Sequence, residues 1–464
     1  MPINELQFLT TKQAWHYRVV PYLLEGNILS VYCEQEIPSN LKSEIVLLTG
    51  CNVEYNIKKK SEIENLLCEH YPRTLTDVHS REYTVKEDSD FLSDLLVEAN
   101  ELRSSDIHIE KYRESARIRF RIDGKLIERF SVLPEQYNVL INKLKIRSSL
   151  DISEKRLPQD GRISVEVNSK KIDLRVSVVP TLQGEKIVLR ILSSDLQKFG
   201  LESIGLSPTQ LKLYRHAYRQ KNGIILISGP TGSGKTTTLY ATLKELNKST
   251  ENILTIEDPI EYTLDGINQV QLKESIGLTF AKALKSFLRQ DPDIIMLGEI
   301  RDKETAEMAI RASLTGHLVL STIHTNSAWG TIARLIDMGI PPYMLSSSLR
   351  LSVAQRLLRL LCQHCKEEVN LSELNIPSEI HNEIKEFRLF KGMGCNHCYN
   401  TGFSGRKAIY EMIPINKEIK RVLSSDKIPE EIQLENFQSL SDGAKFLLSK
   451  GLTTFEEVYP FLID

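Results

Sequence analysis

The sequence lacks long apolar runs and a strong net charge. None of its 464 residues lie in an apolar stretch of about 18 residues, the length that crosses a bilayer. The N-terminal segment MPINELQFLTTKQAW also lacks the apolar centre of a secretory signal. Its 59 Lys and Arg nearly balance its 61 Asp and Glu, for a formal net charge of −2. We therefore expect a cytosolic protein without an overall field that attracts nucleic acid or an anionic membrane.

Cysteine is scarce and unevenly placed. The count of seven is odd, and four of the seven form two C-x-x-C pairs, which favours metal binding in a reducing compartment over a disulfide framework. Four thiolates at this spacing can close a tetrahedral Zn²⁺ site with no open position, so we expect a structural zinc. A redox-active pair is the alternative, and His364 and His397 are alternative ligands. The predicted zinc ligands are Cys362, Cys365, Cys395 and Cys398.

The other three cysteines, Cys33, Cys51 and Cys68, have no metal spacing. We expect them to be small buried core residues.

A glycine-rich segment at residues 229–236 carries the strongest chemical signal. It fits the pattern G-x-x-x-x-G-K-[ST] of a phosphate-binding loop, between a predicted strand at 223–228 and a predicted helix at 237–247. In such a loop the backbone N–H groups converge on phosphate oxygens, Lys235 reaches the β and γ phosphates, and the Thr236 hydroxyl binds Mg²⁺. The predicted nucleotide-binding residues are Gly229, Pro230, Thr231, Gly232, Ser233, Gly234, Lys235, Thr236 and Thr237.

Strands and helices alternate after this loop, which predicts a largely parallel sheet with ligands at the carboxyl ends of its strands. Glu299 follows a buried strand in the position of a Walker B carboxylate, and we expect it to act through Mg²⁺ or the attacking water. Glu257 is its rival for polarising that water, and the residues alone do not separate the two roles. His324 is placed to sense the γ phosphate, whereas His317 is expected to be structural or coupling.

The chain before the loop divides by pattern, and its length predicts about three domains. Residues 1–80 are typical of a small α/β module. Alternating strands then follow an amphipathic helix, with hairpin turns at Asp123-Gly124 and Asn168-Ser169, which predicts a mainly antiparallel sheet. Residues 200–208 are predicted to be a linker, with the nucleotide domain starting near Leu211.

Further motifs resemble one family. Residues 288–302, LRQDPDIIMLGEIRD, resemble the hexameric secretion ATPases of type II secretion and type IV pilus assembly. Residues 256–262 are similar to the aspartate box of that family, and residues 315–326 to its histidine box. Segments 105–110 and 154–162 are similar to signatures of the domain that precedes its ATPase core.

The resemblance implies a multidomain α/β fold with a RecA-like P-loop ATPase core built on a parallel sheet. An α+β, PAS-like domain and a small N-terminal α/β domain precede this core, and a zinc-binding insertion and a helical C-terminal region follow it. The expected domains are a docking domain at 1–80, the α+β domain at 81–200, the ATPase core at 201–361, the zinc module at 362–400 and the helical region at 401–464.

The same resemblance implies a homohexameric motor that hydrolyses ATP with Mg²⁺ and drives the assembly of pilin-like subunits. Its implied partners are an inner-membrane platform protein and a membrane-anchored docking protein, which hold a cytoplasmic ring at the inner membrane, and no nucleic acid is expected. In such rings the sheet domain of one subunit covers the nucleotide of its neighbour. Arg162 and Arg175 thereby become candidate catalytic residues, with Arg121 a weaker match, although the pattern alone favours a solvated sheet face.

Other functions stay open at this point. A DNA-uptake or DNA-processing ring ATPase is the main alternative, and the balanced charge argues against it. A catalytically inactive scaffold is a third hypothesis, which the presence of Lys235, Thr236, Glu257 and Glu299 disfavours. Type II secretion and pilus assembly are not separated, because neither the fibre proteins nor the platform lie in this chain.

Overall fold

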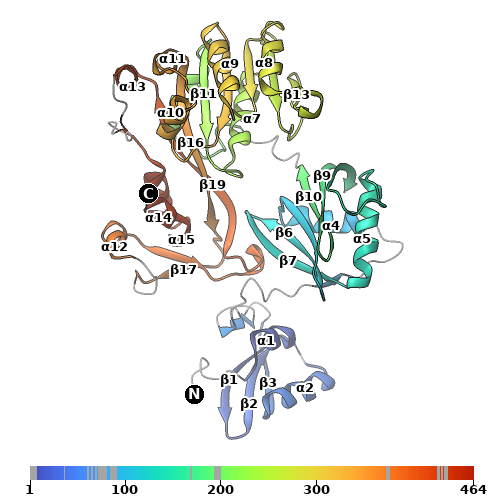
Figure 1. The fold of residues 1–464 in the computed structure, drawn as a ribbon. Coiled ribbons are helices and arrows are strands. Elements are labelled where there is room, and N and C mark those ends of the chain that lie inside the picture. The colour runs from blue at the N-terminus through green and yellow to red at the C-terminus, as the bar shows by residue number, and fades with distance from the viewer. Residues whose placement is uncertain are drawn as a thin grey trace. The chain divides into compact units, whose positions relative to one another are not determined.

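The computed structural model describes residues 8–35, 37–59, 62–63, 66–67, 70–71, 81–83, 91–167, 170–192, 200–371, 377–425, 429, 432 and 437–463. The chain divides into two compact units, one of residues 1–191, 360–375 and 388–405 and one of residues 192–359, 376–387 and 406–464. Figure 1 shows their elements. Within the described ranges, no helix is both long and apolar enough to span a bilayer.

A three-stranded sheet with two helices begins the first unit. The strand order is β1-β2-β3, with β1 antiparallel and β3 parallel to β2. Cys33 and Cys51 are buried in its core, as expected, whereas Cys68 lies outside the described residues. The elements are α1 (Thr11–Tyr17), β1 (Val19–Glu25), β2 (Ile28–Cys33), α2 (Ser39–Thr49) and β3 (Asn52–Ile57).

A seven-stranded, mainly antiparallel sheet with two helices follows, in the order β4-β7-β6-β5-β10-β9-β8. Both predicted hairpins are present as paired strands, β6 with β7 and β8 with β9, although the turn at 168–169 lies outside the described residues. The elements are β4 (Arg81–Tyr83), α4 (Phe91–Glu101), β5 (Asp106–Lys111), β6 (Ala116–Ile122), β7 (Lys125–Val132), α5 (Pro134–Arg147), β8 (Gln159–Val167), β9 (Lys170–Thr181) and β10 (Gly184–Leu192).

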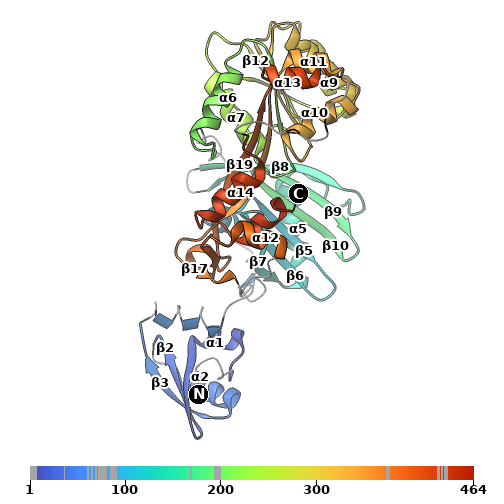
Figure 2. The same ribbon diagram turned by 90° about the vertical axis from the view of Figure 1, so that its left-hand side faces the viewer.

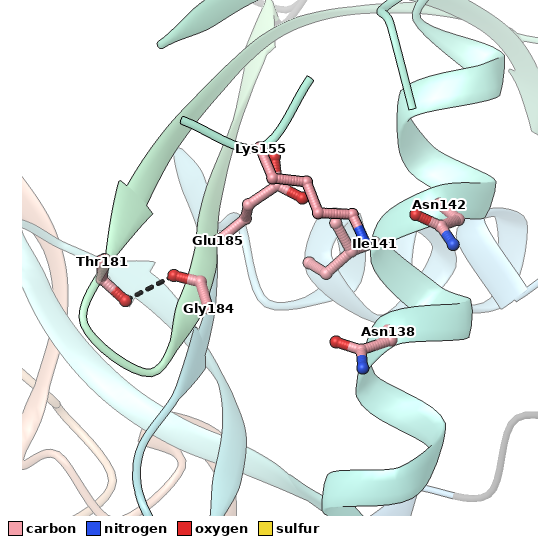
Figure 3. A pocket seen from close by; sticks show the side chains of 7 residues that line it. All are labelled: Asn138, Ile141, Asn142, Lys155, Thr181, Gly184 and Glu185. Atoms are coloured by element: carbon pink, nitrogen blue, oxygen red, sulfur yellow. Dashed lines mark hydrogen bonds between the residues drawn. The ribbon is translucent and has the colours of Figure 1, made fainter. Parts of the chain in front are cut away.

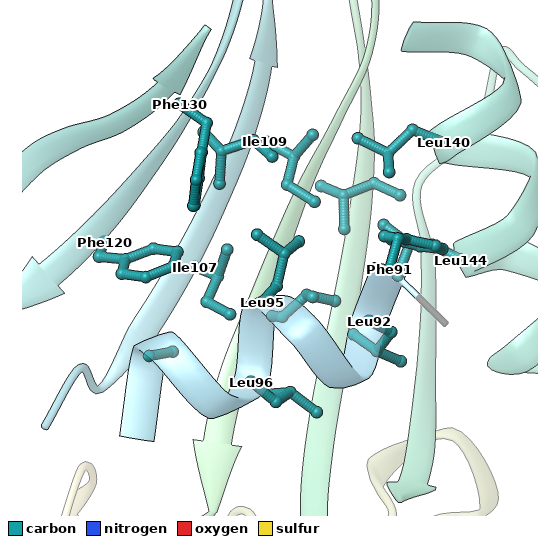
Figure 4. Packing of buried hydrophobic residues seen from close by; sticks show 14 of the residues in the cluster. Phe91, Leu92, Leu95, Leu96, Ile107, Ile109, Phe120, Phe130, Leu140 and Leu144 are labelled. Atoms are coloured by element: carbon teal, nitrogen blue, oxygen red, sulfur yellow. The ribbon is translucent and has the colours of Figure 1, made fainter. Parts of the chain in front are cut away.

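Alternation along the strands builds the core of this α+β part. Every second residue of β6 is buried and the residues between are partly exposed, so the strand presents one apolar and one polar face. Figure 4 shows the side chains of α4 pointing at the apolar face, with Leu95 beside Ile107 and Phe120. The polar face carries the arginines of β6, since the helices pack against the other face.

The cysteine segment contains a short antiparallel pair, β17 (Lys366–Val369) with β18 (Leu389–Gly392). A single 3₁₀ turn, η5 (Asn396–Cys398), carries the last cysteine. The helix α12 (Ser378–Ile384) lies between β17 and β18 in the chain.

The second seven-stranded sheet has the order β13-β12-β14-β15-β11-β16-β19. All five pairings from β13 through β16 are parallel, and β11, β12, β14 and β15 are buried along their whole length, as expected for strands covered on both faces. Figure 2 shows α6 and α7 on one face and α9 and α10 on the other. The strands are β11 (Gly223–Ser228), β12 (Ile253–Glu257), β13 (Asn268–Gln271), β14 (Ile294–Leu297), β15 (Leu318–Ile323), β16 (Leu349–Leu361) and β19 (Phe403–Pro414).

Two helices of this part follow an N-cap residue of a type that is favoured at that position. The side chains of Thr279 and Asp302 accept N–H groups of the first turns of α8 and α9. The helices are α6 (Pro208–Tyr218), α7 (Lys235–Leu246), η3 (Glu274–Ile276), α8 (Phe280–Phe287), α9 (Lys303–Leu314), α10 (Ala328–Asp337), α11 (Pro342–Ser348), α13 (Lys417–Leu423), α14 (Leu440–Ser449), α15 (Phe455–Val458) and η6 (Tyr459–Phe461).

Two expectations need correction. The C-terminal region 401–464 is not purely helical, because it opens with β19, which completes the sheet beside β16. Residues 408–413 are all buried there, so an apolar run interrupted only by Glu411 forms a strand instead of a helix. The predicted linker 200–208 is also wrong, because Leu201 and Ile204 are buried in the core of this second sheet and α6 begins at Pro208.

Candidate active site

The phosphate loop joins β11 to α7 as predicted, and two of its glycines are required by space as well as by φ. Gly229 has a φ of 147°, and a Cβ there would lie 2.5 Å from the Gln355 carbonyl oxygen. Gly234 has a φ of 88°, and a Cβ there would lie 2.8 Å from the Gln355 side chain. The helix α7 starts without a side-chain cap, so its first N–H groups point into the loop where phosphate oxygens bind in such sites.

Two side chains of the loop are buried. The Lys235 ammonium donates to the carbonyl oxygens of Gly229 at 2.8 Å and Pro230 at 3.0 Å. Burial lowers the pKa of Lys235, and the negative charge of Glu299 opposes that shift. The Ser233 hydroxyl is buried and has no hydrogen-bond partner within the described chain. Thr236 is exposed on the first turn of α7.

Four ionisable side chains converge where β12, β14 and β15 end. The Arg301 guanidinium donates to Glu299, and to the Asp258 carboxylate at 3.3 Å. The His324 Nε2 lies 3.1 Å from the other Glu299 oxygen. The Glu299 side chain is only 16% exposed, whereas that of His324 is 52% exposed. Glu299 therefore lies at the centre of the cluster, with more accessible groups around it.

Glu257 has a different environment, although it ends the neighbouring strand. It is 3% exposed, and its carboxylate accepts hydrogen bonds from three side chains. The donors are the hydroxyl of Tyr240 on α7, the hydroxyl of Thr255 at 2.6 Å and the amide of Gln269 at 3.1 Å. Both carboxylate oxygens are engaged, and the negative charge of Glu257 contributes, after burial, to raising the pKa of Tyr240.

His317 does not join this cluster. Its Nδ1 lies 2.9 Å from the Ala312 carbonyl oxygen, at the C-terminal end of α9, and 3.3 Å from the Thr315 hydroxyl. This position fits the structural role expected for it.

Two polar residues of β16 lie against the loop and were not among the predicted site residues. The buried Gln355 accepts a hydrogen bond from Thr238 at 2.9 Å, and Arg356 donates to the Asn326 carbonyl oxygen at 2.8 Å. The Arg356 guanidinium lies 3.1 Å from the position that a Cβ on Gly229 would take. The available signal was the adjacent polar pair in the strand Leu349–Leu361, a weak one because Arg350, Ser352 and Arg359 are polar too.

The two candidate catalytic arginines lie in the α+β part. Arg162 on β8 and Arg175 on β9 are direct cross-strand partners. Arg162 is exposed and Arg175 is half-buried. Arg121, the weaker candidate, is paired with Asp106 at 3.5 Å and donates to the Gly124 carbonyl oxygen.

The four predicted zinc ligands come together. Their sulfur atoms all lie within 4.8 Å of one another, with contacts of 3.7 to 3.8 Å between three of the pairs. Zn–S bonds of about 2.3 Å in a tetrahedron place sulfurs about 3.8 Å apart, so the spacing fits zinc. Cys398 accepts the backbone N–H groups of Cys395 and Gly402, and the hydrogen bond from Cys365 lowers the pKa of Cys398 to about 5. The rings of His364 and His397 stack on each other 3.9 Å apart, outside the set of four.

A small pocket of the α+β part holds none of the predicted site residues (Figure 3). It is lined by Asn138, Ile141, Asn142, Lys155, Thr181, Gly184 and Glu185.

The parallel sheet and its phosphate loop define the class of P-loop nucleotide-binding proteins. The profile of the family described as Type II/IV secretion system protein matches residues 86–460. This chain belongs to that family and is a secretion ATPase, as the motif resemblance implied.

Individual relatives agree. The chain is 45% identical over 367 residues to the type II secretion system protein E of Pseudomonas aeruginosa, covering 78% of this chain and 73% of the relative. It is 39% identical over 490 residues to the type IV pilus assembly ATPase PilB of Myxococcus xanthus, covering 98% and 86%.

Solved structures show the same fold. The pilus retraction motor PilT with bound ADP matches 80% of this chain and 96% of its own, at 28% identity and a TM-score of 0.55. The ATPase DotB of Legionella pneumophila matches 82% and 98%, at 21% identity and a TM-score of 0.62, and supports the fold alone.

Proposed function

We infer that this chain hydrolyses ATP at the phosphate loop, with Mg²⁺, and that it works as a homohexameric motor for assembling pilin-like subunits. The observation that carries the chemical part is the Glu299 cluster at the carboxyl ends of β12, β14 and β15, of which β15 pairs with the loop-bearing strand β11. Phosphoryl transfer to water needs held phosphates and a carboxylate that orients the attacking water. The edge of this sheet supplies both.

The residues fit a nucleoside triphosphate. Three features of the loop suit a phosphate chain. Gly229 and Gly234 leave no room for a Cβ, α7 starts without a side-chain cap, and the Ser233 hydroxyl is buried. The Lys235 ammonium exchanges its loop carbonyls for phosphate oxygens when the nucleotide binds. Bound Mg²⁺ offsets phosphate charge, and the exposed Thr236 hydroxyl would hold it.

We assign different roles to the two glutamates. Glu299 is the carboxylate that faces water, and Arg301 orients it. His324, whose Nε2 lies 3.1 Å from a Glu299 oxygen, would report the state of the γ phosphate through that contact. Glu257 positions α7, because Tyr240, Thr255 and Gln269 take three of the roughly four acceptor sites of its buried carboxylate, which leaves it less available to a water than Glu299.

The proposal also covers the assembly of subunits into a ring and the partners of that ring. Arg162 and Arg175 put two cations opposite each other on adjacent strands, which suits an anion such as the phosphates of a neighbouring subunit. The names of the relatives support work in type II secretion or pilus assembly, and do not separate the two. The proposed partners are an inner-membrane platform protein and a membrane-anchored docking protein, so that the ring lies at the cytoplasmic face of the membrane. The four cysteines hold a structural Zn²⁺.

The ring proposal is tested by ATPase rate against protein concentration, with particle mass measured at each concentration. The rate per subunit should rise as a hexamer forms. Arg162→Ala and Arg175→Ala should assemble yet lose about 1,000-fold in rate, whereas Arg113→Ala, in an exposed turn of the same domain, should behave as wild type. A rate per subunit that stays constant down to monomer would remove the shared site.

A further inference from the structure

Glu411 is a buried carboxylate in β19 to which none of the roles above is assigned. It is 7% exposed, and burial raises its pKa. One carboxylate oxygen accepts the backbone N–H of Ala328 at 2.7 Å, and the other lies 3.4 Å from the backbone N–H of Leu440. These are the first residues of α10 and α14, so one carboxylate lies at the N-terminal ends of two helices.

Both helices are already capped by their own residues. The Ser327 hydroxyl accepts the Gly330 N–H at 2.9 Å, and Ser439 forms a capping box with Asp442. A further acceptor is therefore not needed to start either helix. What Glu411 adds is a connection between them, because they are separated in the chain by β16 and β19.

The helix α10 is also connected to the nucleotide site. Its start follows His324, which contacts Glu299. The connecting segment is held by Arg356 at the Asn326 carbonyl oxygen, 2.8 Å away, and the Ala328 carbonyl oxygen accepts the Ser352 hydroxyl at 2.7 Å. The positive charge of Arg356 also acts on both Glu411 and Lys235. A movement of the segment 324–327 therefore changes the position of the Ala328 N–H that Glu411 binds.

We propose that Glu411 is a positioning residue that couples the nucleotide state at His324 to the C-terminal helix α14, through the N-terminal ends of α10 and α14. The inference rests on the proposed hydrolysis at the phosphate loop. It makes α14 a responding element, so that nucleotide binding changes the protection of its first turn without any direct contact to the nucleotide.

The test compares Glu411→Gln with Glu457→Gln. Glu457 on α15 also accepts a backbone N–H, that of Arg359 at 3.2 Å, and pairs with the Arg359 guanidinium, so its replacement removes a carboxylate that is bound to β16. We expect Glu411→Gln to lower kcat about tenfold, with the KM for ATP and the affinity for ADP within twofold of wild type. Glu457→Gln should keep the wild-type kcat.

Hydrogen exchange supplies a readout that a merely stabilising residue would not move. In the wild type, a non-hydrolysable ATP analogue with Mg²⁺ should slow exchange at the amides of residues 440–444, and Glu411→Gln should lose that response while residues 235–240 keep theirs. The inference is overturned if the wild type shows no response at 440–444, a result available even if the variant does not fold. It is also overturned if both variants respond equally. Failure of the wild type to bind or hydrolyse ATP would instead refute the proposed function.

Discussion

The two seven-stranded sheets of this protein place their charged side chains in different ways. In the parallel sheet, strands β11, β12, β14 and β15 are buried throughout, and the charges follow the strand ends, at Asp258, Glu299, Arg301 and His324. In the antiparallel sheet the charges lie along a face. Glu110 on β5 is bonded to Arg117 and Arg119 on β6 and to Lys186 on β10.

The two sheets place their charges differently because helices cover them in different ways. Helices on both faces of the four buried strands of the parallel sheet leave only the strand ends for unpaired charges, since an unpaired charge between sheet and helix would be costly. The helices α4 and α5 contribute to the apolar core on one face of the antiparallel sheet, so its other face can carry alternating charges that pair across strands. Charge at an edge remains available for a ligand, whereas charge along a face is largely used in pairing.

We expect the largest effect on the ATPase rate from a substitution at the carboxyl-end edge of the parallel sheet. Lys235→Ala removes the ammonium that binds the phosphate loop, and we expect the ATPase rate to fall at least about 100-fold. Lys248→Ala, an exposed lysine just after α7, should keep the wild-type rate. Steady-state phosphate release measures both variants. Normal turnover in Lys235→Ala would show that the edge of the parallel sheet is not where the chemistry occurs.

The cysteine cluster depends on neither sheet for its chemistry, so its loss should be local. Cys395→Ser should reduce the bound zinc from about one per chain to none, because a tetrahedral site with three thiolates binds far more weakly. Hydrogen exchange should quicken over residues 362–402. Metal analysis of the purified protein decides the matter, with Cys33→Ser, buried in the N-terminal module, as the matched control. Equal zinc in the two variants would contradict the assignment.

We expect the smallest effect, a change in stability, at the charged face of the antiparallel sheet. Burial opposes the ionisation of Glu110, but hydrogen bonds from Arg119 and Lys186 outweigh it and lower the pKa of Glu110 from its ordinary 4.5 to about 2. Because the folded pKa lies below the unfolded one, the stabilisation is complete above about pH 4.5 and is lost as the pH falls towards 2.

Glu110→Gln should therefore weaken this sheet by roughly 2 kcal/mol at neutral pH and flatten its acid sensitivity. Hydrogen exchange of the β5 and β6 amides, corrected for intrinsic rates, measures this change. Glu114→Gln, in the exposed turn between those strands, should keep the wild-type profile. An unchanged profile in Glu110→Gln would mean that pairing along this face adds nothing to stability.

Much of the fold could be predicted because local patterns and tertiary environment agree. The phosphate loop, the caps at Thr279 and Asp302, and the hairpin at Asp123-Gly124 each follow from residues a few positions apart. The gathering of the four cysteines followed from their metal chemistry alone.

What the sequence could not supply depends on distant partners. The different roles that we propose for Glu257 and Glu299 depend on the contacts of Tyr240 and Gln269 with Glu257, which only the structure shows. Strand β19 was missed because its neighbour β16 lies far away in the chain. A separation of 30 residues likewise hid the contact of Arg356 with Asn326. The linker was misjudged because Leu201 and Ile204 look isolated until the core that buries them is known.

The most direct test of this account measures kcat, nucleotide affinity and thermal stability for Glu299→Gln and Glu257→Gln in parallel. We predict that Glu299→Gln binds ATP and unfolds as wild type does but loses at least about 100-fold in kcat. Glu257→Gln should unfold at a lower temperature and keep much more of its turnover. The reverse pattern, with Glu257→Gln stable but inactive and Glu299→Gln active, would contradict the assignment of Glu299 as the carboxylate that faces water.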